Sequence, residues 1–133
     1  MRLLAFALLV LTAAAQPGRA PDRVLRGETV TGRLVGWEMG DYLWARIAVR
    51  GREAMSAQPG PDPIGPFLEA HRGRPLQLRI DSVSTYIPEA GGMTEIQRIT
   101  AARAGRVTAS AWWRRLSPAE RRAARRRLDR AVQ

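Results

Sequence analysis

Aromatic rings and guanidinium groups gather in one alternating stretch of the chain, residues 30–49, VTGRLVGWEMGDYLWARIAV. Aromatic side chains can stack on sugar rings or bases while neighbouring arginines pair with phosphate, sulfate or carboxylate groups. This combination is typical of anion binding rather than of bond cleavage. The candidate binding residues of the stretch are Arg33, Trp37, Tyr42, Trp44 and Arg46.

The C-terminal segment carries a second group of the same kinds of side chain. Residues 112–133 hold eight arginines against Glu120 and Asp129, a local net charge of +6. Arginines four residues apart on a helix repel each other, at a cost of about 0.2–0.5 kcal/mol per pair. We therefore expect this basic tail to become well ordered only against an anionic partner. Its candidate binding residues are Trp112, Trp113, Arg114, Arg115, Arg121, Arg122, Arg125 and Arg126.

Two partners would satisfy these charges, an anionic membrane surface or another polyanion. A membrane attracts each nearby basic residue by about 1 kcal/mol. Nucleic acid is a poor candidate, because the first 15 residues predict a signal peptide and an exported protein rarely meets nucleic acid. Two simpler interpretations stay open: the hairpin aromatics can complete the core, since large aromatics are usually buried, and the tail can be a solvated basic segment.

No pattern in the chain indicates catalysis or metal binding. The chain has no cysteine, which excludes disulfides, a thiolate nucleophile and cysteine metal sites. His71 is the only histidine, and with no second ligand at metal-binding spacing we expect a surface or helix-capping role. No nucleophile elbow or phosphate-binding glycine loop is present. The sequence therefore predicts a binding protein with no enzymatic activity, metal or cofactor.

The first 15 residues, MRLLAFALLVLTAAA, predict a signal peptide. They combine a basic residue, an apolar run and small residues, with cleavage expected after Ala15 or, as second choice, after Ala20. The apolar run is shorter than the roughly 20 residues that span a bilayer. We expect an exported protein of the bacterial cell envelope, periplasmic or secreted. The alternative function is a structural or accessory envelope protein that docks on a protein partner.

The strand signals are strongest over residues 30–49, where apolar and polar residues alternate. With residues 38–41 as the turn, Trp37 would face Tyr42, and Arg33 would face Arg46, on one side of a hairpin. The core-facing side would carry Val30, Gly32, Leu34, Gly36, Leu43, Ala45, Ile47 and Val49.

The other elements follow from turn, cap and alternation signals. Residues 93–104 are ambiguous between helix and strand, and we favour a strand over 94–100. Ser117 is expected to cap a final helix, with proline following it and Glu120 three residues later. The remaining expectations are strands over 53–56, 76–80, 83–87 and 107–111, a bend near Ser82, a proline-rich loop over 58–66, a short helix over 66–72, a turn over 88–92 and the final helix over 118–131.

These elements predict a mainly β protein, a small, partly open β-barrel of OB-like or SH3-like topology with a C-terminal α-helix. A two-layer α+β arrangement is the alternative. The expected organisation is a signal peptide over 1–15, a flexible lead-in over 16–23, the barrel domain over 24–111 and the basic helical tail over 112–133.

Overall fold

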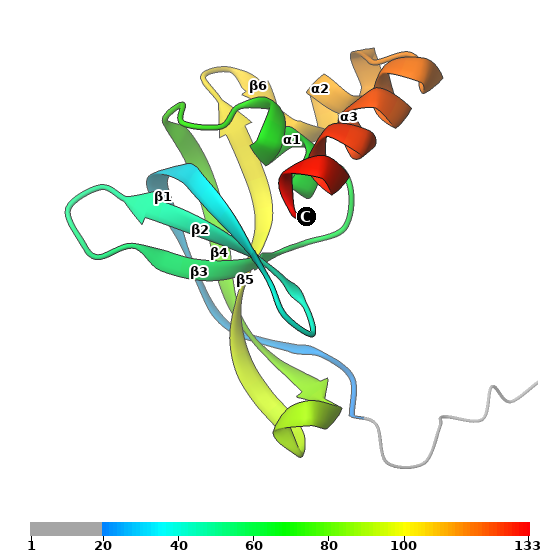
Figure 1. The fold of residues 1–133 in the computed structure, drawn as a ribbon. Helices are drawn as coiled ribbons and strands as arrows, with labels where there is room; N and C mark the ends of the chain where they lie inside the picture. Colours follow the sequence, from blue (N-terminus) through cyan, green and yellow to red (C-terminus); the bar gives the residue numbers. More distant parts are fainter. Residues whose placement is uncertain (1–19) are drawn as a thin grey trace, which may run out of the picture.

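The computed structural model describes residues 20–133, so the predicted signal peptide lies outside the described residues. The described chain is mainly β, with three short helices at one end of the sheet (Figure 1). Its elements are β1 (Arg23–Met39), β2 (Leu43–Val49), β3 (Met55–Pro59), α1 (Ile64–Ala70), β4 (Leu76–Ile87), the 3-10 turn η1 (Pro88–Ala90), β5 (Gly92–Ala104), β6 (Val107–Thr108), α2 (Ala109–Arg115) and α3 (Pro118–Ala131).

The six strands form one sheet in the order β3–β2–β1–β4–β5–β6, and a parallel pairing of β3 with β5 joins the strands into a ring of hydrogen bonds. Strand β1 is long enough to serve both halves of this ring. Its residues 23–32 pair with β4, and its residues 32–39 pair with β2. Gly32 is the residue at which β1 passes from one partner to the other. A Cβ on this glycine would lie 3.2 Å from the Ala48 carbonyl oxygen, so the backbones approach each other closely at this point.

The expected hairpin is present, but its register differs from the predicted one. Val35 is an extra residue between paired positions, so Gly36 lies opposite Arg46 and Trp37 opposite Ala45. A bulge of this kind reverses which side of the strand the following residues occupy. Trp37 consequently lies on the core side of the sheet, and its predicted place beside Tyr42 on the outer face is wrong.

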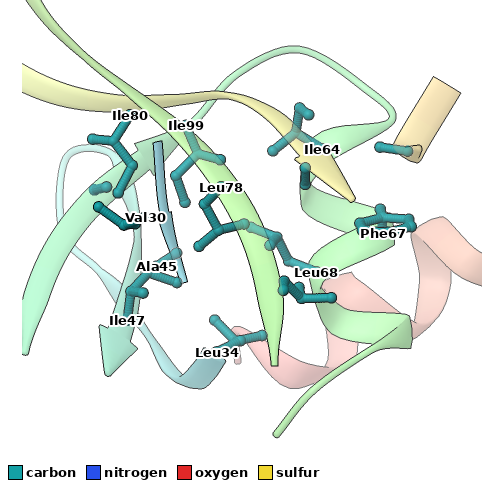
Figure 2. Packing of buried hydrophobic residues seen from close by; sticks show 14 of the residues in the cluster. Val30, Leu34, Ala45, Ile47, Ile64, Phe67, Leu68, Leu78, Ile80 and Ile99 are labelled. Carbon is teal, nitrogen blue, oxygen red and sulfur yellow. The ribbon is translucent and has the colours of Figure 1, made fainter. Parts of the chain in front are cut away.

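The buried apolar side chains form one continuous cluster inside the ring (Figure 2). Ile47, Leu78 and Ile99 from three strands are fully buried in it. The short helix α1 closes one end of the cluster, because Phe67 and Leu68 are fully buried against the strand side chains. This position of Phe67 and Leu68 at an end of the ring agrees with the short helix predicted there.

Several other local predictions are confirmed with shifted boundaries, but the strand predicted over 107–111 ends at Thr108 and α2 begins at Ala109. Residues 93–104 are strand, as favoured, and Ser117 caps α3 by accepting a hydrogen bond from the Glu120 amide at 3.1 Å. The proline-rich loop is shorter than expected, since β3 continues to Pro59 and α1 begins at Ile64. The change of alternation predicted near Ser82 is present in β4, but the extra residues lie in the partner strands, at Leu25 in β1 and Thr100 in β5.

The predicted flexible lead-in ends earlier than residue 23. Asp22 accepts hydrogen bonds from the Thr85 hydroxyl at 2.6 Å and from the Arg98 guanidinium at 3.1 Å. Arg23 is already the first residue of β1. One carboxylate thus joins the start of β1 to β4 and β5, a role that the polar sequence around it did not indicate.

Candidate functional site

The outer face of β1, β2 and β3 presents the clearest arrangement of potential ligand-binding groups. Ala45, Ile47 and Ala57 are fully buried on the inner side of this part of the sheet. Side chains alternate along a strand, so their neighbours lie on the opposite side. This outer face, which we call the sheet face, carries Glu38, Trp44, Arg46, Ser56, Gln58 and Arg98.

Trp44 is the aromatic side chain on the sheet face. It is partly exposed and lies opposite Glu38, next to Arg46 along β2. Within residues 20–133, no buried side-chain nitrogen lacks a hydrogen-bond partner, and no hydrogen bond involves the Trp44 side chain. The indole Nε1 of Trp44 therefore reaches solvent. An indole held in this way can stack on a ring and donate a hydrogen bond.

Trp37 has a different environment, although it was predicted to face Tyr42 on the same side of the hairpin as Trp44. Its Nε1 donates to the Glu69 carboxylate of α1 at 2.8 Å, and its ring packs against the core. Glu69 also pairs with Arg72 at 3.0 Å. Trp37 thus fixes α1 to the strands, which separates it from the other candidate residues of the hairpin.

The arginines of the sheet face form ion pairs and hydrogen bonds within the chain, and their guanidinium groups stay near the surface. Arg46 pairs with Glu38 at 3.2 Å, with about half of each side chain exposed. The Arg98 guanidinium donates to Gln58 Oε1 at 3.1 and 3.2 Å, and also pairs with Asp22. Gln58 and Arg98 were not identified from the sequence, because β3 was expected to end before Gln58. The alternation of polar Arg98 with apolar Ile99 in the sequence was the signal that could have placed Arg98 on the outer face.

The loops at the edge of the sheet face are in contact. The Tyr42 hydroxyl, in the turn between β1 and β2, donates to Glu89 Oε2 of η1 at 3.1 Å. These residues are 47 positions apart in the sequence. The contact joins the β1–β2 turn to the β4–β5 turn, so both turns belong to one rim.

Arg33 lies on the same side of the sheet, beyond the bulge and opposite Ala48. A hollow of about 300 Å³ opens beside it and is also lined by Thr31, Arg50 and Pro75. Neither Arg33 nor Arg50 has an ion pair in the described part of the chain. Both guanidinium groups are therefore available to an anionic ligand.

The basic tail packs against the body of the protein. The Trp112 ring contacts Phe67 edge-on at 5.5 Å and His71 at 5.8 Å between ring centroids. Ala124 of α3 is buried, and Arg125 pairs with Asp62 at 2.7 Å. The expectation that this segment becomes ordered only against an anionic partner does not describe the structure, because the sequence did not reveal α2 or the surface that receives α3.

Trp113 connects α2 to α3. The guanidinium carbons of Arg121 and Arg125 lie 5.5 and 5.0 Å from the Trp113 ring centroid. Arg121 Nε also donates to the Trp113 carbonyl oxygen at 3.1 Å. Trp113, Arg121 and Arg125 thus make contacts within the chain. The remaining arginines proposed for the tail, Arg114, Arg115, Arg122 and Arg126, are exposed and have no ion pair within residues 20–133.

A double-mutant cycle should detect the contact between Trp113 and Arg125. We expect a coupling free energy of about 0.5–1 kcal/mol between Trp113→Leu and Arg125→Gln, from the cation–π attraction between the two side chains. Urea unfolding of the wild type, both single variants and the double variant measures it. Additive losses of stability would show that the two side chains do not interact in solution.

The single histidine is buried, and the predicted surface position is therefore wrong. His71 Nδ1 lies 2.8 Å from the Phe67 carbonyl oxygen, and the His71 amide donates to the same oxygen at 3.1 Å. Both contacts place His71 at the C-terminal end of α1, in agreement with the capping role. Within residues 20–133, no three acidic or histidine side chains are grouped to hold a metal ion. No helix in that range is long and apolar enough to cross a membrane.

Comparisons of the chain with protein-family models, curated proteins and solved structures find no match.

Proposed function

We propose that the protein is a non-enzymatic binding protein built on an OB-like barrel, and that its sheet face binds an acidic polysaccharide. Support for the OB-like description comes from the ring of β1, β2, β3, β5 and β4, with α1 between β3 and β4. Barrels of this type bind oligosaccharides and oligonucleotides on the face of strands 2 and 3, between the β1–β2 and β4–β5 loops. A fold does not by itself define a function, whereas the side chains on the sheet face limit which ligands it can bind.

The observation that carries the proposal is the position of Trp44 among charged and polar groups. Its indole N–H reaches solvent next to Arg46, on the face that also holds Arg98 and Gln58. A ring can stack on the indole while an acidic group pairs with a guanidinium. Both contacts suit a chain of sugar rings that carry carboxylate or sulfate groups.

Acidic side chains on the same face favour a sugar chain over nucleic acid. Glu38 lies opposite Trp44, and Asp22 contacts Arg98. Carboxylates accept hydrogen bonds from sugar hydroxyls but repel closely spaced phosphates. Single-stranded nucleic acid is usually bound by several aromatic platforms in a positively charged groove, whereas Trp44 is one platform with mixed charges around it.

The cellular setting of this proposal rests on the predicted signal peptide. An exported protein would meet acidic polymers in the bacterial envelope, either in the periplasm or outside the cell. A structural or accessory protein that docks on a protein partner through the sheet face is the second proposal. The exposed side chains of Val35 and Met39, at 49% and 58%, are the observation that favours it. The two proposals differ in the expected effect of salt, since charge pairing weakens with ionic strength and apolar contact does not.

Calorimetric titration with oligogalacturonate tests the ligand, with a neutral dextran oligosaccharide and a single-stranded DNA oligomer as comparisons. We expect binding of oligogalacturonate at low salt and little binding of neutral dextran. Trp44→Ala should weaken binding about 10-fold or more, because the loss of one stacking contact costs on the order of 1–3 kcal/mol.

Trp113→Leu is the matched control, because it removes a tryptophan that lies outside the sheet face. Its affinity for oligogalacturonate should equal that of the wild type. Tighter binding of DNA than of oligogalacturonate would show that the ligand is nucleic acid and not an acidic polysaccharide. Equal losses of affinity in Trp44→Ala and Trp113→Leu would show that the sheet face is not the binding site.

A further inference from the structure

Three arginines form a straight row on the outer side of α3. Arg122, Arg126 and Arg130 are all exposed, and none of them has an ion pair within residues 20–133. Residues four apart lie on one side of a helix, and the helical rise separates successive members of the row by about 6 Å along the axis. We call these three residues the arginine row.

The other side of α3 is fixed to the protein. Ala124 is 6% exposed, and a Cβ placed on Gly65 of α1 would lie 2.9 Å from the Leu128 Cδ2 atom. The two helices therefore touch at Gly65 and Leu128. By helical periodicity, the arginine row lies opposite this packed side. Its side chains are thus presented to solvent by a helix that is already folded and oriented.

The three guanidinium groups of the arginine row repel one another, and no carboxylate within residues 20–133 forms an ion pair with any of them. Each like-charged pair four residues apart is unfavourable, and the only acidic residues of α3 are Glu120 and Asp129. The exposed arginines Arg114 and Arg115 at the end of α2 add to the same charge. A surface of dispersed negative charge would relieve this repulsion.

We propose that the arginine row docks the protein on an anionic lipid bilayer. The hollows of about 300, 400 and 450 Å³ in the described part of the chain are lined by no residue of α3. The helix α3 contains no aromatic residue, and a linear polymer such as single-stranded nucleic acid is usually bound by several aromatic platforms. The helix can instead lie along a flat layer of lipid headgroups, to which each basic residue contributes separately.

Co-sedimentation of the full chain with lipid vesicles tests this docking. One set of vesicles contains phosphatidylcholine alone, and the other contains phosphatidylcholine mixed with phosphatidylglycerol. The triple variant Arg122→Gln, Arg126→Gln, Arg130→Gln should bind the anionic vesicles about 100-fold more weakly than the wild type at low salt. Both proteins share residues 1–19, so the difference between them reports the arginine row.

The matched control removes the same charge from three other exposed arginines without ion pairs, by Arg23→Gln, Arg74→Gln and Arg106→Gln. This control should keep most of the affinity for anionic vesicles. An equal loss in the control would show that overall charge, and not the row, governs binding. Unchanged vesicle binding in the row variant would overturn the proposal, as would binding of the row to single-stranded DNA but not to vesicles.

The docking is independent of the ligand proposed for the sheet face. Trp44→Ala should bind anionic vesicles as tightly as the wild type. Circular dichroism should show that the row variant remains folded, because its three side chains are exposed and make no hydrogen bond, ion pair or ring contact within residues 20–133.

Discussion

Phe67→Ala is expected to lower the free energy of unfolding by about 3–5 kcal/mol. Phe67 is fully buried where α1 closes one end of the ring, and its ring centroid lies 4.1 Å from that of His71 and 5.5 Å from that of Trp112. Truncation removes apolar contacts with the strands and with α2 together. Because domains of this size are stable by only about 5–15 kcal/mol, the loss should be visible as a large shift of the urea midpoint.

Met39→Ala provides the comparison, since Met39 is 58% exposed at the tip of the β1–β2 hairpin. It should cost well under 1 kcal/mol. Far-UV circular dichroism during urea unfolding measures both variants. If Phe67→Ala does not fold, Phe67→Leu keeps the comparison quantitative through a smaller loss. Equal stability of the Phe67 and Met39 variants would mean that α1 does not close the ring in solution.

The parts of the fold that follow from local chemistry were predictable. Ser117 and the proline after it place the start of α3, and the alternation of Leu76, Leu78 and Ile80 identifies β4. Strand pairing and ring closure depend on contacts between distant residues, such as the two-pair contact of β3 with β5. This contact was not predicted, because it includes Pro59 at the end of β3 and proline in a sequence argues against a strand.

The candidate site was predictable only in part, for a physical reason that concerns register. Trp44 and Arg46 lie on the outer face, as the alternation indicates, but the bulge at Val35 transfers Trp37 to the core side. A bulge leaves little trace in a sequence, because it changes pairing and not composition. The helix α2 was missed for a related reason, since its tryptophans have the composition of an exposed binding segment and pack instead against α1 and α3.

Two glycines of β1 allow the bulge itself to be tested. A Cβ on Gly32 would lie 2.8 Å from Ile47 Cγ2 and 3.2 Å from the Ala48 carbonyl oxygen, whereas a Cβ on Gly36 would meet nothing within 4 Å. Gly32→Val should therefore lower the free energy of unfolding by about 1–3 kcal/mol through overpacking. Gly36→Val should leave it unchanged or raise it by up to about 1 kcal/mol, because valine favours a strand more than glycine does.

Urea unfolding of Gly32→Val and Gly36→Val distinguishes the register with the bulge at Val35 from the register with uninterrupted alternation. With uninterrupted alternation, both glycines would lie on the core side, and both valines would have to enter the packed interior. With the extra residue at Val35, Gly36 lies opposite Arg46 on the sheet face, and its valine would remain outside the core. A loss of stability in Gly32→Val without a loss in Gly36→Val therefore requires the bulge. Equal losses at both positions would instead indicate the uninterrupted register, in which Trp37 faces Tyr42 on the sheet face.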